Sequence, residues 1–245
     1  KNKKTRYAIT NVKGFEPSDN GHAQTFMQSS LTNANSRTVL NLGLGRRYLS
    51  DDEGVITGLN AFLDYDPEYG HQRFSIGGEL KASAFELTAN SYKALTKWKK
   101  GKNSNQERAL DGRDIELGAQ IPYMPAAKLY VKNWKWKGED GAGDTKGNTY
   151  SLAFSQLISG VQVELGRRDY DGLQKDENFG QLTYTIPMGG APAQSSKPLF
   201  LDGKYKPDDG WLNPPVNNNS NNNSNNNASN SDKNYIPDNN PINNK

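Results

Sequence analysis

The sequence contains no cysteine, so disulfide bonds and thiolate metal sites are excluded. It has only two histidines, His22 and His71, and neither has the spacing to a second ligand or base that a metal site or histidine-based catalysis uses. No run of about 18 apolar residues is present, which excludes a transmembrane helix. The formal net charge of +3 is too small to indicate nucleic-acid binding. We therefore predict no enzyme activity and no catalytic, cofactor-binding or metal-binding residue.

What the sequence does contain is a two-residue alternation of apolar and polar side chains. In the segment 38–49, Leu40, Leu42 and Leu44 alternate with Asn41 and small residues. Successive side chains of a β-strand point to opposite faces, so each such segment has one apolar and one polar face. Ten strands are predicted, with a weaker eleventh at 6–13; the ten are 25–33, 38–49, 55–66, 72–82, 84–97, 112–122, 127–137, 148–158, 160–170 and 178–188.

The connections between these strands alternate in length. The long ones, at 99–111, 138–147 and 171–177, are polar, and the short turns lie at 82–83, 123–126 and 159–160. Strands of about 9–11 residues can cross a membrane, and outer-membrane barrels have long loops outside and short turns in the periplasm. The sequence thus predicts an all-β fold, a transmembrane antiparallel up-and-down β-barrel of about 10–12 strands spanning residues 5–190.

The sequence changes character at about residue 191. Five prolines from Pro192 to Pro215 prevent a further strand, and an Asn/Ser-rich run follows at 217–230. Such a segment has no apolar residues with which to build a core. Residues 191–245 are therefore predicted to be a linker or disordered tail.

The polar faces of the strands are predicted to line the lumen of the barrel. Charges of both signs occur there in similar numbers, which favours a network of salt bridges that fills the interior over a selective pore. Inward glycines are interpreted as leaving room for something to pass or sit. The predicted lumen-lining residues are Asn41, Gly43, Gly45, Arg47, Gly58, Asn60, Asp64, Arg73, Gly77, Glu79, Asp114, Glu116 and Glu164.

Aromatic residues gather near the predicted strand ends. Girdles at the two membrane interfaces would place them there, although aromatics are favoured in strands anyway. The girdle prediction covers Tyr48, Tyr65, Trp98, Tyr123, Trp134, Trp136, Tyr150 and Tyr170.

Several segments resemble the β-domain of the intimin/invasin family, the inverse autotransporters. The motifs are specific in the first three strands and looser beyond Gly147, and the resemblance extends over about residues 5–188. The first segments are Gly43-Leu-Gly-Arg-Arg47, Gly58-Leu-Asn-Ala-Phe-Leu-Asp-Tyr-Asp66, His71-Gln-Arg-Phe-Ser-Ile-Gly-Gly-Glu79 and Asn90-Ser-Tyr92; later similar ones are Gly112-Arg-Asp-Ile-Glu116, Ile121-Pro122, Leu129-Tyr-Val131 and Gln181-Leu-Thr-Tyr184.

The resemblance implies a twelve-stranded barrel in the Gram-negative outer membrane that carries a C-terminal passenger to the cell surface. The expected function is therefore an anchor and translocator that displays a C-terminal segment, with adhesion as the family role. The implied partners are outer-membrane lipid, the barrel-assembly machinery and the chain's own tail in the lumen. A host-cell receptor would be reached only through a passenger, and residues 191–245 do not resemble one. The family brings no catalytic residues.

Three alternatives stay open at this point. A small porin or purely structural barrel would share the lipid face, an outer-membrane enzyme would need a clustered acid/base set, and a soluble β-sandwich would need no lipid. The number of predicted strands, odd or even, adds one expectation. If the long loops face outward, the strand at 6–13 starts at the outer side, so a twelfth strand upstream of Lys1 is favoured over a ten-stranded barrel.

Overall fold

The computed structural model describes residues 5–18, 21–34, 37–52, 54–82, 84–101, 106–139, 143–172 and 174–186. Eleven long strands form one antiparallel sheet, and each pairs with the next long strand along the chain. No helix in these ranges is long and apolar enough to cross a membrane. The sheet contains β1 (Arg6–Pro17), β2 (Ala23–Ala34), β3 (Arg37–Leu49), β4 (Val55–Tyr65), β5 (Gln72–Ala82), β6 (Phe85–Ala94), β9 (Gly112–Gln120), β10 (Ala127–Trp136), β11 (Thr145–Ser155), β12 (Val161–Asp171) and β13 (Glu177–Tyr184).

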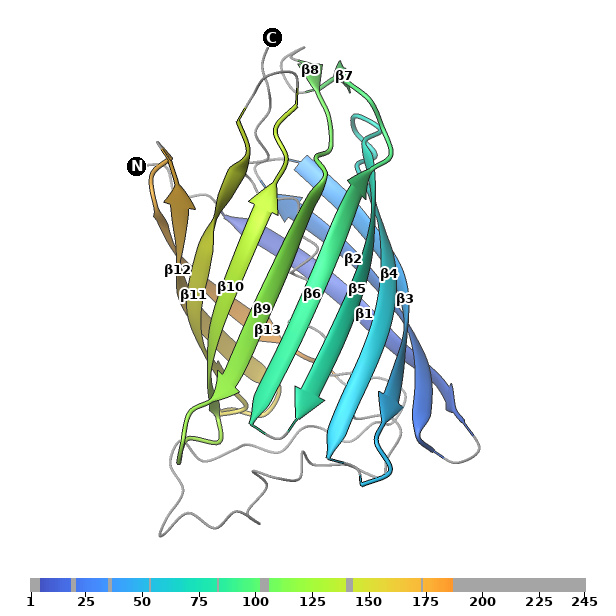
Figure 1. Cartoon of the computed structure of the whole chain (residues 1–245), viewed down its shortest axis with the longest axis vertical. Helices are drawn as coiled ribbons and strands as arrows, with labels where there is room; N and C mark the ends of the chain where they lie inside the picture. The colour runs from blue at the N-terminus through green and yellow to red at the C-terminus, as the bar shows by residue number, and fades with distance from the viewer. Residues whose placement is uncertain are drawn as a thin grey trace.

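The sheet curls round into a barrel-shaped wall with its strands strongly tilted (Figure 1). One end, here called the long-loop end, carries the connections 66–71, 95–111, 137–144 and 172–176. The other, the short-turn end, carries 18–22, 50–54, 83–84, 121–126 and 156–160. The three connections predicted to be long therefore lie at one end and the three predicted short turns at the other, although the long-loop end also carries the two-residue connection 35–36.

The predicted strands agree with the observed ones to within a few residues, with two differences. The strand predicted only weakly at 6–13 is a full strand, β1, which pairs with β2 from Arg6 to Pro17. The connection predicted as a loop at 99–111 contains a small hairpin of β7 (Lys99–Lys100) and β8 (Gln106–Glu107). The prediction of a disordered tail at 191–245 lies outside the described residues.

The burial pattern is the inverse of that of a soluble protein. Leu42, Ile76 and Leu117 point outward and are 54%, 56% and 48% exposed. Asn41 and Ser75, one residue before two of them, are 7% and 2% exposed. Soluble proteins bury aliphatic side chains and expose polar ones, whereas a barrel in lipid does the reverse. A soluble β-sandwich is incompatible with this single sheet and its apolar outer face.

The two edge strands of the sheet, β1 and β13, have one neighbour each. β1 pairs with β2 and β13 with β12, and no ladder joins β1 to β13 in the described part of the chain. A closed eleven-stranded ring would have contradicted the expectation of a further strand, and it is not formed. That further strand stays a prediction.

Candidate functional site: the interior of the barrel

The predicted lumen-lining residues all lie on the inward face of the sheet. Register makes this visible, because cross-strand partners share a face: Asn41 faces Asp64, which faces Arg73, and Glu116 faces Lys132. Glu164, on β12, is partly exposed but alternates with the outward Leu165. Twelve of the thirteen residues lie on β3, β4, β5 and β9, and Glu164 alone lies on β12.

One ion pair joins β3 to β5 across the intervening strand β4. Arg47 on β3 donates to Glu79 on β5 through its Nε at 2.5 Å and its Nη2 at 3.1 Å, and Lys81 lies 3.3 Å from the same carboxylate. Gly58 of β4 lies between them in register. A Cβ on Gly58 would be 2.6 Å from Glu79 Oε1, so only glycine leaves space for the bridge.

A second cluster holds a fully buried guanidinium. Arg73 is 1% exposed and donates to Asp64 Oδ2 from Nε at 3.0 Å and from Nη2 at 2.8 Å. Asn41 donates to the other oxygen of Asp64 at 2.7 Å. The guanidinium also lies over the adjacent rings of Tyr92 and Trp136, 4.8 Å from each centroid. Charge, hydrogen bonds and aromatic faces all stabilise this buried cation.

A third cluster surrounds Asp114 on β9. Its carboxylate accepts hydrogen bonds from Tyr92 Oη at 2.8 Å and Asn90 Nδ2 at 2.9 Å, and Lys132 Nζ lies 3.2 Å away. Buried carboxylates need such partners because desolvation is costly. The predicted salt-bridge network is therefore present, with cations and anions paired across the strands.

The inward glycines do not leave the open room that the sequence suggested. Their neighbours' large side chains cover them: a Cβ on Gly43 would be 2.0 Å from the Phe62 ring, and one on Gly45 would be 2.3 Å from the Phe26 ring. Asn60 and Asn90 cover Gly77 in the same way. These glycines allow rings and amides to lie flat against the wall, so the interpretation that they widen the lumen is wrong.

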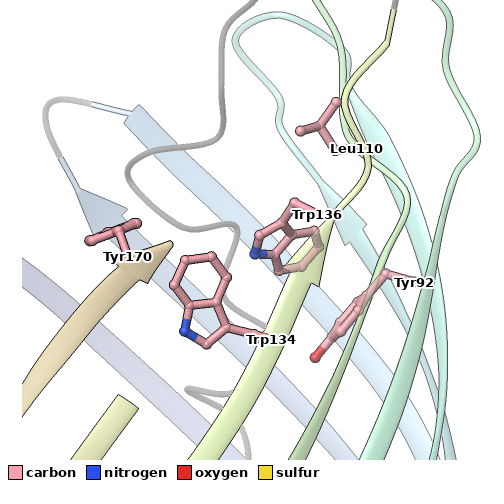
Figure 2. Packing of buried hydrophobic residues seen from close by; sticks show 5 residues of the cluster. All are labelled: Tyr92, Leu110, Trp134, Trp136 and Tyr170. Atoms are coloured by element: carbon pink, nitrogen blue, oxygen red, sulfur yellow. The ribbon is translucent and has the colours of Figure 1, made fainter. Parts of the chain in front are cut away.

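The long-loop end of the interior contains an aromatic cluster. Tyr92, Leu110, Trp134, Trp136 and Tyr170 are buried together, as Figure 2 shows. The rings of Tyr92 and Trp136 are 5.1 Å apart, and those of Trp134 and Tyr170 are 5.2 Å apart. Three members of the predicted girdle therefore point inward, which corrects that part of the prediction for Trp134, Trp136 and Tyr170. Tyr48, Tyr65, Tyr123 and Tyr150 are exposed and Trp98 is partly exposed.

The connection 95–111 folds against this end of the interior. Arg37 of β3 lies 2.9 Å from Glu107 and 2.6 Å from Asp66, and both carboxylates are almost fully buried. Lys99 donates to the carbonyl of Gly70 at 2.9 Å, and Leu110 belongs to the aromatic cluster. The connection is therefore tied to β3 and to the connection 66–71 by an ion pair and a hydrogen bond, and to the aromatic cluster by packing.

The contacts of Arg37 with Asp66 and Glu107 are here called the tie. His71 lies beside the tie and is 3% exposed. Burial lowers the pKa of its imidazole, the nearby Arg37 lowers it further, and Asp66 and Glu107 act in the opposite direction. Neither ring nitrogen has a hydrogen-bond partner among the described residues. The neutral imidazole is therefore the form that this site favours.

The interior has two contrasting regions. The charged wall consists of the inward side chains of β3 to β6, β9 and β10, where the ion pairs lie. The uncharged wall consists of ten inward residues of β1 and β2, bordered at the long-loop end by Arg6, which is in register with Ala34: Ala8, Thr10, Val12, Gly14, Gln24, Phe26, Gln28, Ser30, Thr32 and Ala34. The uncharged wall presents neutral hydroxyl and amide groups to the interior, whereas the charged wall presents ions that are paired with one another.

Sequence reasoning missed three parts of this site. The ring of Tyr92 was not assigned a role, the tie of Arg37 to Asp66 and Glu107 joins residues far apart in sequence, and the burial of His71 next to a predicted strand was not anticipated. Alternation along the strand could have placed its ring inward, because Tyr92 is in phase with Thr88 and Asn90 and out of phase with Leu87. Nothing in the sequence pattern indicated the long-range contacts of Glu107.

Comparison with known proteins gives a family and a fold. Residues 1–204 match the family model described as "Inverse autotransporter, beta-domain". The chain is 26% identical over 173 residues to "Invasin" of Yersinia enterocolitica, which covers 64% of this chain and 20% of that protein. It is 32% identical over 103 residues to "Intimin" of Escherichia coli O111:H-, which covers 40% of this chain and 11% of the relative.

It is also 31% identical over 103 residues to "Inverse autotransporter adhesin YeeJ" of Escherichia coli K12, covering 41% of this chain and 4% of the relative. The chain thus spans a fifth or less of each of these three relatives. A solved structure from a study of the in-meso crystallization of membrane proteins has a TM-score of 0.63 and 23% identity, covering 75% of this chain and 76% of that one. At that identity the likeness establishes the fold.

Proposed function

Because the chain belongs to the inverse autotransporter β-domain family, whose relatives place it in the Gram-negative outer membrane, we propose that it is a translocator barrel. In this proposal the barrel anchors the protein and carries the segment that follows β13 through its interior to the cell surface. The long-loop end faces outward, and the short-turn end faces the periplasm.

The observation that carries the proposal is the division of the interior into two walls. The charged wall forms a fixed surface because its ions are paired and its glycines are covered. The uncharged wall has Thr10, Ser30 and Gln28, whose neutral hydrogen-bonding groups suit a polypeptide in extended form. The segment after β13 is itself mostly neutral, with an Asn/Ser run at 217–230. We infer that this segment passes along the uncharged wall.

In this proposal, adhesion is the role of a passenger domain carried by the barrel and not of the barrel itself. The relatives named "Intimin", "Invasin" and "Inverse autotransporter adhesin" are far longer than this chain. A domain joined to the C-terminal segment would meet a host cell at the surface, and the barrel itself would meet only lipid and the assembly machinery. In this proposal, no acidic or basic group of the interior takes part in catalysis.

An epitope tag tests the proposed orientation. A tag placed at Asn105, in the connection 95–111, and a second at the C-terminus are expected to bind antibody on intact cells. A tag at Met124, in a short turn, is expected to bind only after the outer membrane is permeabilised. Detection of Met124 on intact cells and of Asn105 only after permeabilisation would invert the topology.

The second candidate function is a small porin, which needs an open lumen. The buried aromatic cluster occupies part of the interior at the long-loop end, and that observation favours the translocator. Single-channel conductance separates the two. Deletion of residues 191–245 is expected to raise the conductance in planar bilayers, whereas equal conductance with and without these residues would favour the porin.

A further inference from the structure

Three cations stand side by side on the outward face of the sheet. Arg113 on β9 is paired in register with Lys135 on β10, and Lys135 is paired with Lys146 on β11. Their strand positions alternate with those of the inward Asp114, Trp134 and Gly147, so all three side chains point away from the interior. Directly opposed like charges on neighbouring strands destabilise a sheet. The row Arg113–Lys135–Lys146 is here called the cation row.

The local carboxylates balance this row only in part. Lys135 lies 2.6 Å from Asp144, and Lys146 lies 3.5 Å from Asp171, in pairs whose side chains are a third to a half exposed. Exposed pairs of this kind contribute about 0–1 kcal/mol. Arg113 is exposed and forms no ion pair with a carboxylate of the described residues. The row therefore has three cations against two paired carboxylates, and the guanidinium of Arg113 has no side-chain hydrogen bond within the described part of the chain.

The cation row borders the apolar outer face at the long-loop end. Toward the middle of the same strands follow the Asn133–Asn148 amide pair, whose Nδ2–Oδ1 distance is 2.9 Å, and then Leu117, Val131 and Tyr150. These three are 48%, 39% and 44% exposed. Cations at this height lie where the acyl chains end and the head groups begin, and their long stems can reach toward the head-group phosphates.

We propose that the cation row binds the phosphate groups of lipid head groups in the membrane leaflet at the long-loop end. Arg113 would bind a phosphate through two parallel N–H donors, and Lys135 and Lys146 would supply the neighbouring charges. The bound phosphate offsets the repulsion between the three cations. Its assignment to the outer leaflet rests on the proposed function, in which the long loops face outward.

The outward face supplies a matched control at the opposite end. Lys13 on β1 and Arg46 on β3 are also exposed and outward, but they are not paired with each other in register, and Arg46 lies 5.5 Å from the ring of Tyr48. The pair of variants R113Q/K135Q and K13Q/R46Q therefore removes one arginine and one lysine from each end. Heat-modifiable migration on gels shows that each variant is folded.

The test is native mass spectrometry of the full chain in a zwitterionic detergent, titrated with diphosphorylated lipid A. The R113Q/K135Q variant is expected to bind about thirtyfold more weakly than the wild type, since each cation near a lipid surface contributes about 1 kcal/mol. K13Q/R46Q is expected to stay within about twofold of the wild type. Dephosphorylated lipid A is expected to lose affinity for the wild type, and inorganic phosphate is expected not to compete, because it lacks the acyl chains.

An equal loss of affinity for lipid A in the two variants would show that the effect is general charge attraction, and it would overturn the proposal. Unchanged affinity in R113Q/K135Q, or equal binding of the dephosphorylated lipid, would overturn it as well. Competition by inorganic phosphate would contradict the membrane as the source of the phosphate. The titration needs no membrane orientation, so reversed epitope tags would overturn the topology while leaving phosphate binding intact.

Discussion

The charged wall and the uncharged wall are parts of one sheet with the same alternation, yet their inward side chains have different roles. On the charged wall, Asp64, Arg73 and Glu79 are buried and paired, and Gly58 makes room for the pair of Glu79 with Arg47. On the uncharged wall, Thr10 and Ser30 are in register with each other and present neutral hydroxyl groups to the interior. The first region holds the shape of the barrel, and the second has the neutral polar surface along which we propose that the chain passes.

The difference shows why polar residues inside a barrel cannot be treated as one class. A paired ion such as Arg73 is a structural element, because removing its partner leaves a buried charge. A neutral hydroxyl such as Ser30 can exchange partners at little cost. The walls should therefore respond in opposite ways to substitutions that break structure and substitutions that alter passage.

The largest expected effect is on the charged wall. Asp64→Asn leaves the buried guanidinium of Arg73 without its counter-charge and is expected to lower the free energy of unfolding by about 3–5 kcal/mol. Ser30→Ala on the uncharged wall is expected to change it by less than about 1 kcal/mol. Urea unfolding in lipid vesicles, followed by tryptophan fluorescence, measures both. Equal costs would remove the energetic distinction between the walls.

The next effect compares the outer face with the interior. Leu42→Arg places a charge on the lipid-facing side, 54% exposed in the structure, and is expected to cost about 2–4 kcal/mol. Thr10→Arg places the same charge inside, on the uncharged wall, and is expected to cost less because that face is polar. Both variants are compared by unfolding in vesicles. A costlier Thr10→Arg would reverse the assignment of the two faces.

A smaller effect tests the covered glycines. Gly58→Ala would bring a Cβ to 2.6 Å from Glu79 and disturb its bridge to Arg47, at an expected cost of about 1–3 kcal/mol. Gly78→Ala is the control, because a Cβ there has no neighbour closer than 3.8 Å. The free energies of unfolding of the two variants are compared directly. If Gly78→Ala were the more destabilising, the glycines would not be explained by the side chains that cover them.

The smallest effect concerns pH and the tie at the long-loop end. Burial holds the pKa of His71 below its ordinary value of 6.5, so the unfolded or opened site binds more protons than the closed one as pH falls below that value. The tie is therefore stable at neutral pH and weakens on acidification. Hydrogen exchange of Glu107–Leu110, corrected for intrinsic rates, is expected to be faster relative to reference amides at about pH 5.5 than at about pH 7.5.

The variant His71→Gln is the control for that measurement, because it cannot titrate in this range. Its exchange at Glu107–Leu110 is expected to show no comparable pH dependence. A pH dependence of the same size in the variant would assign the effect to other groups of the tie, such as Asp66 or Glu107.

Much of the fold could be predicted from the sequence because a two-residue period survives in every long strand. The alternation of Leu40 with Asn41 determines which face meets lipid, whatever the neighbours are. The girdle prediction was wrong for Trp134 and Trp136 because their position near a strand end was given more weight than the alternation of the strand. That alternation places both rings on the face opposite to Asn133 and Lys135. The covering of Gly58 could not be predicted, since it depends on the cross-strand register that places Arg47 and Glu79 on either side.

The most direct test of the central claim uses the absence of cysteine from the chain. A cysteine at Ser195, in the segment after β13, is combined with a second one at Ser30 on the uncharged wall or at Ser75 on the charged wall. Oxidative cross-linking in isolated outer membranes is expected to join Ser195 to Ser30 in much higher yield than to Ser75. Preferential cross-linking to Ser75, or none to either wall from Ser195 and its neighbours in turn, would contradict passage of the chain along the uncharged wall.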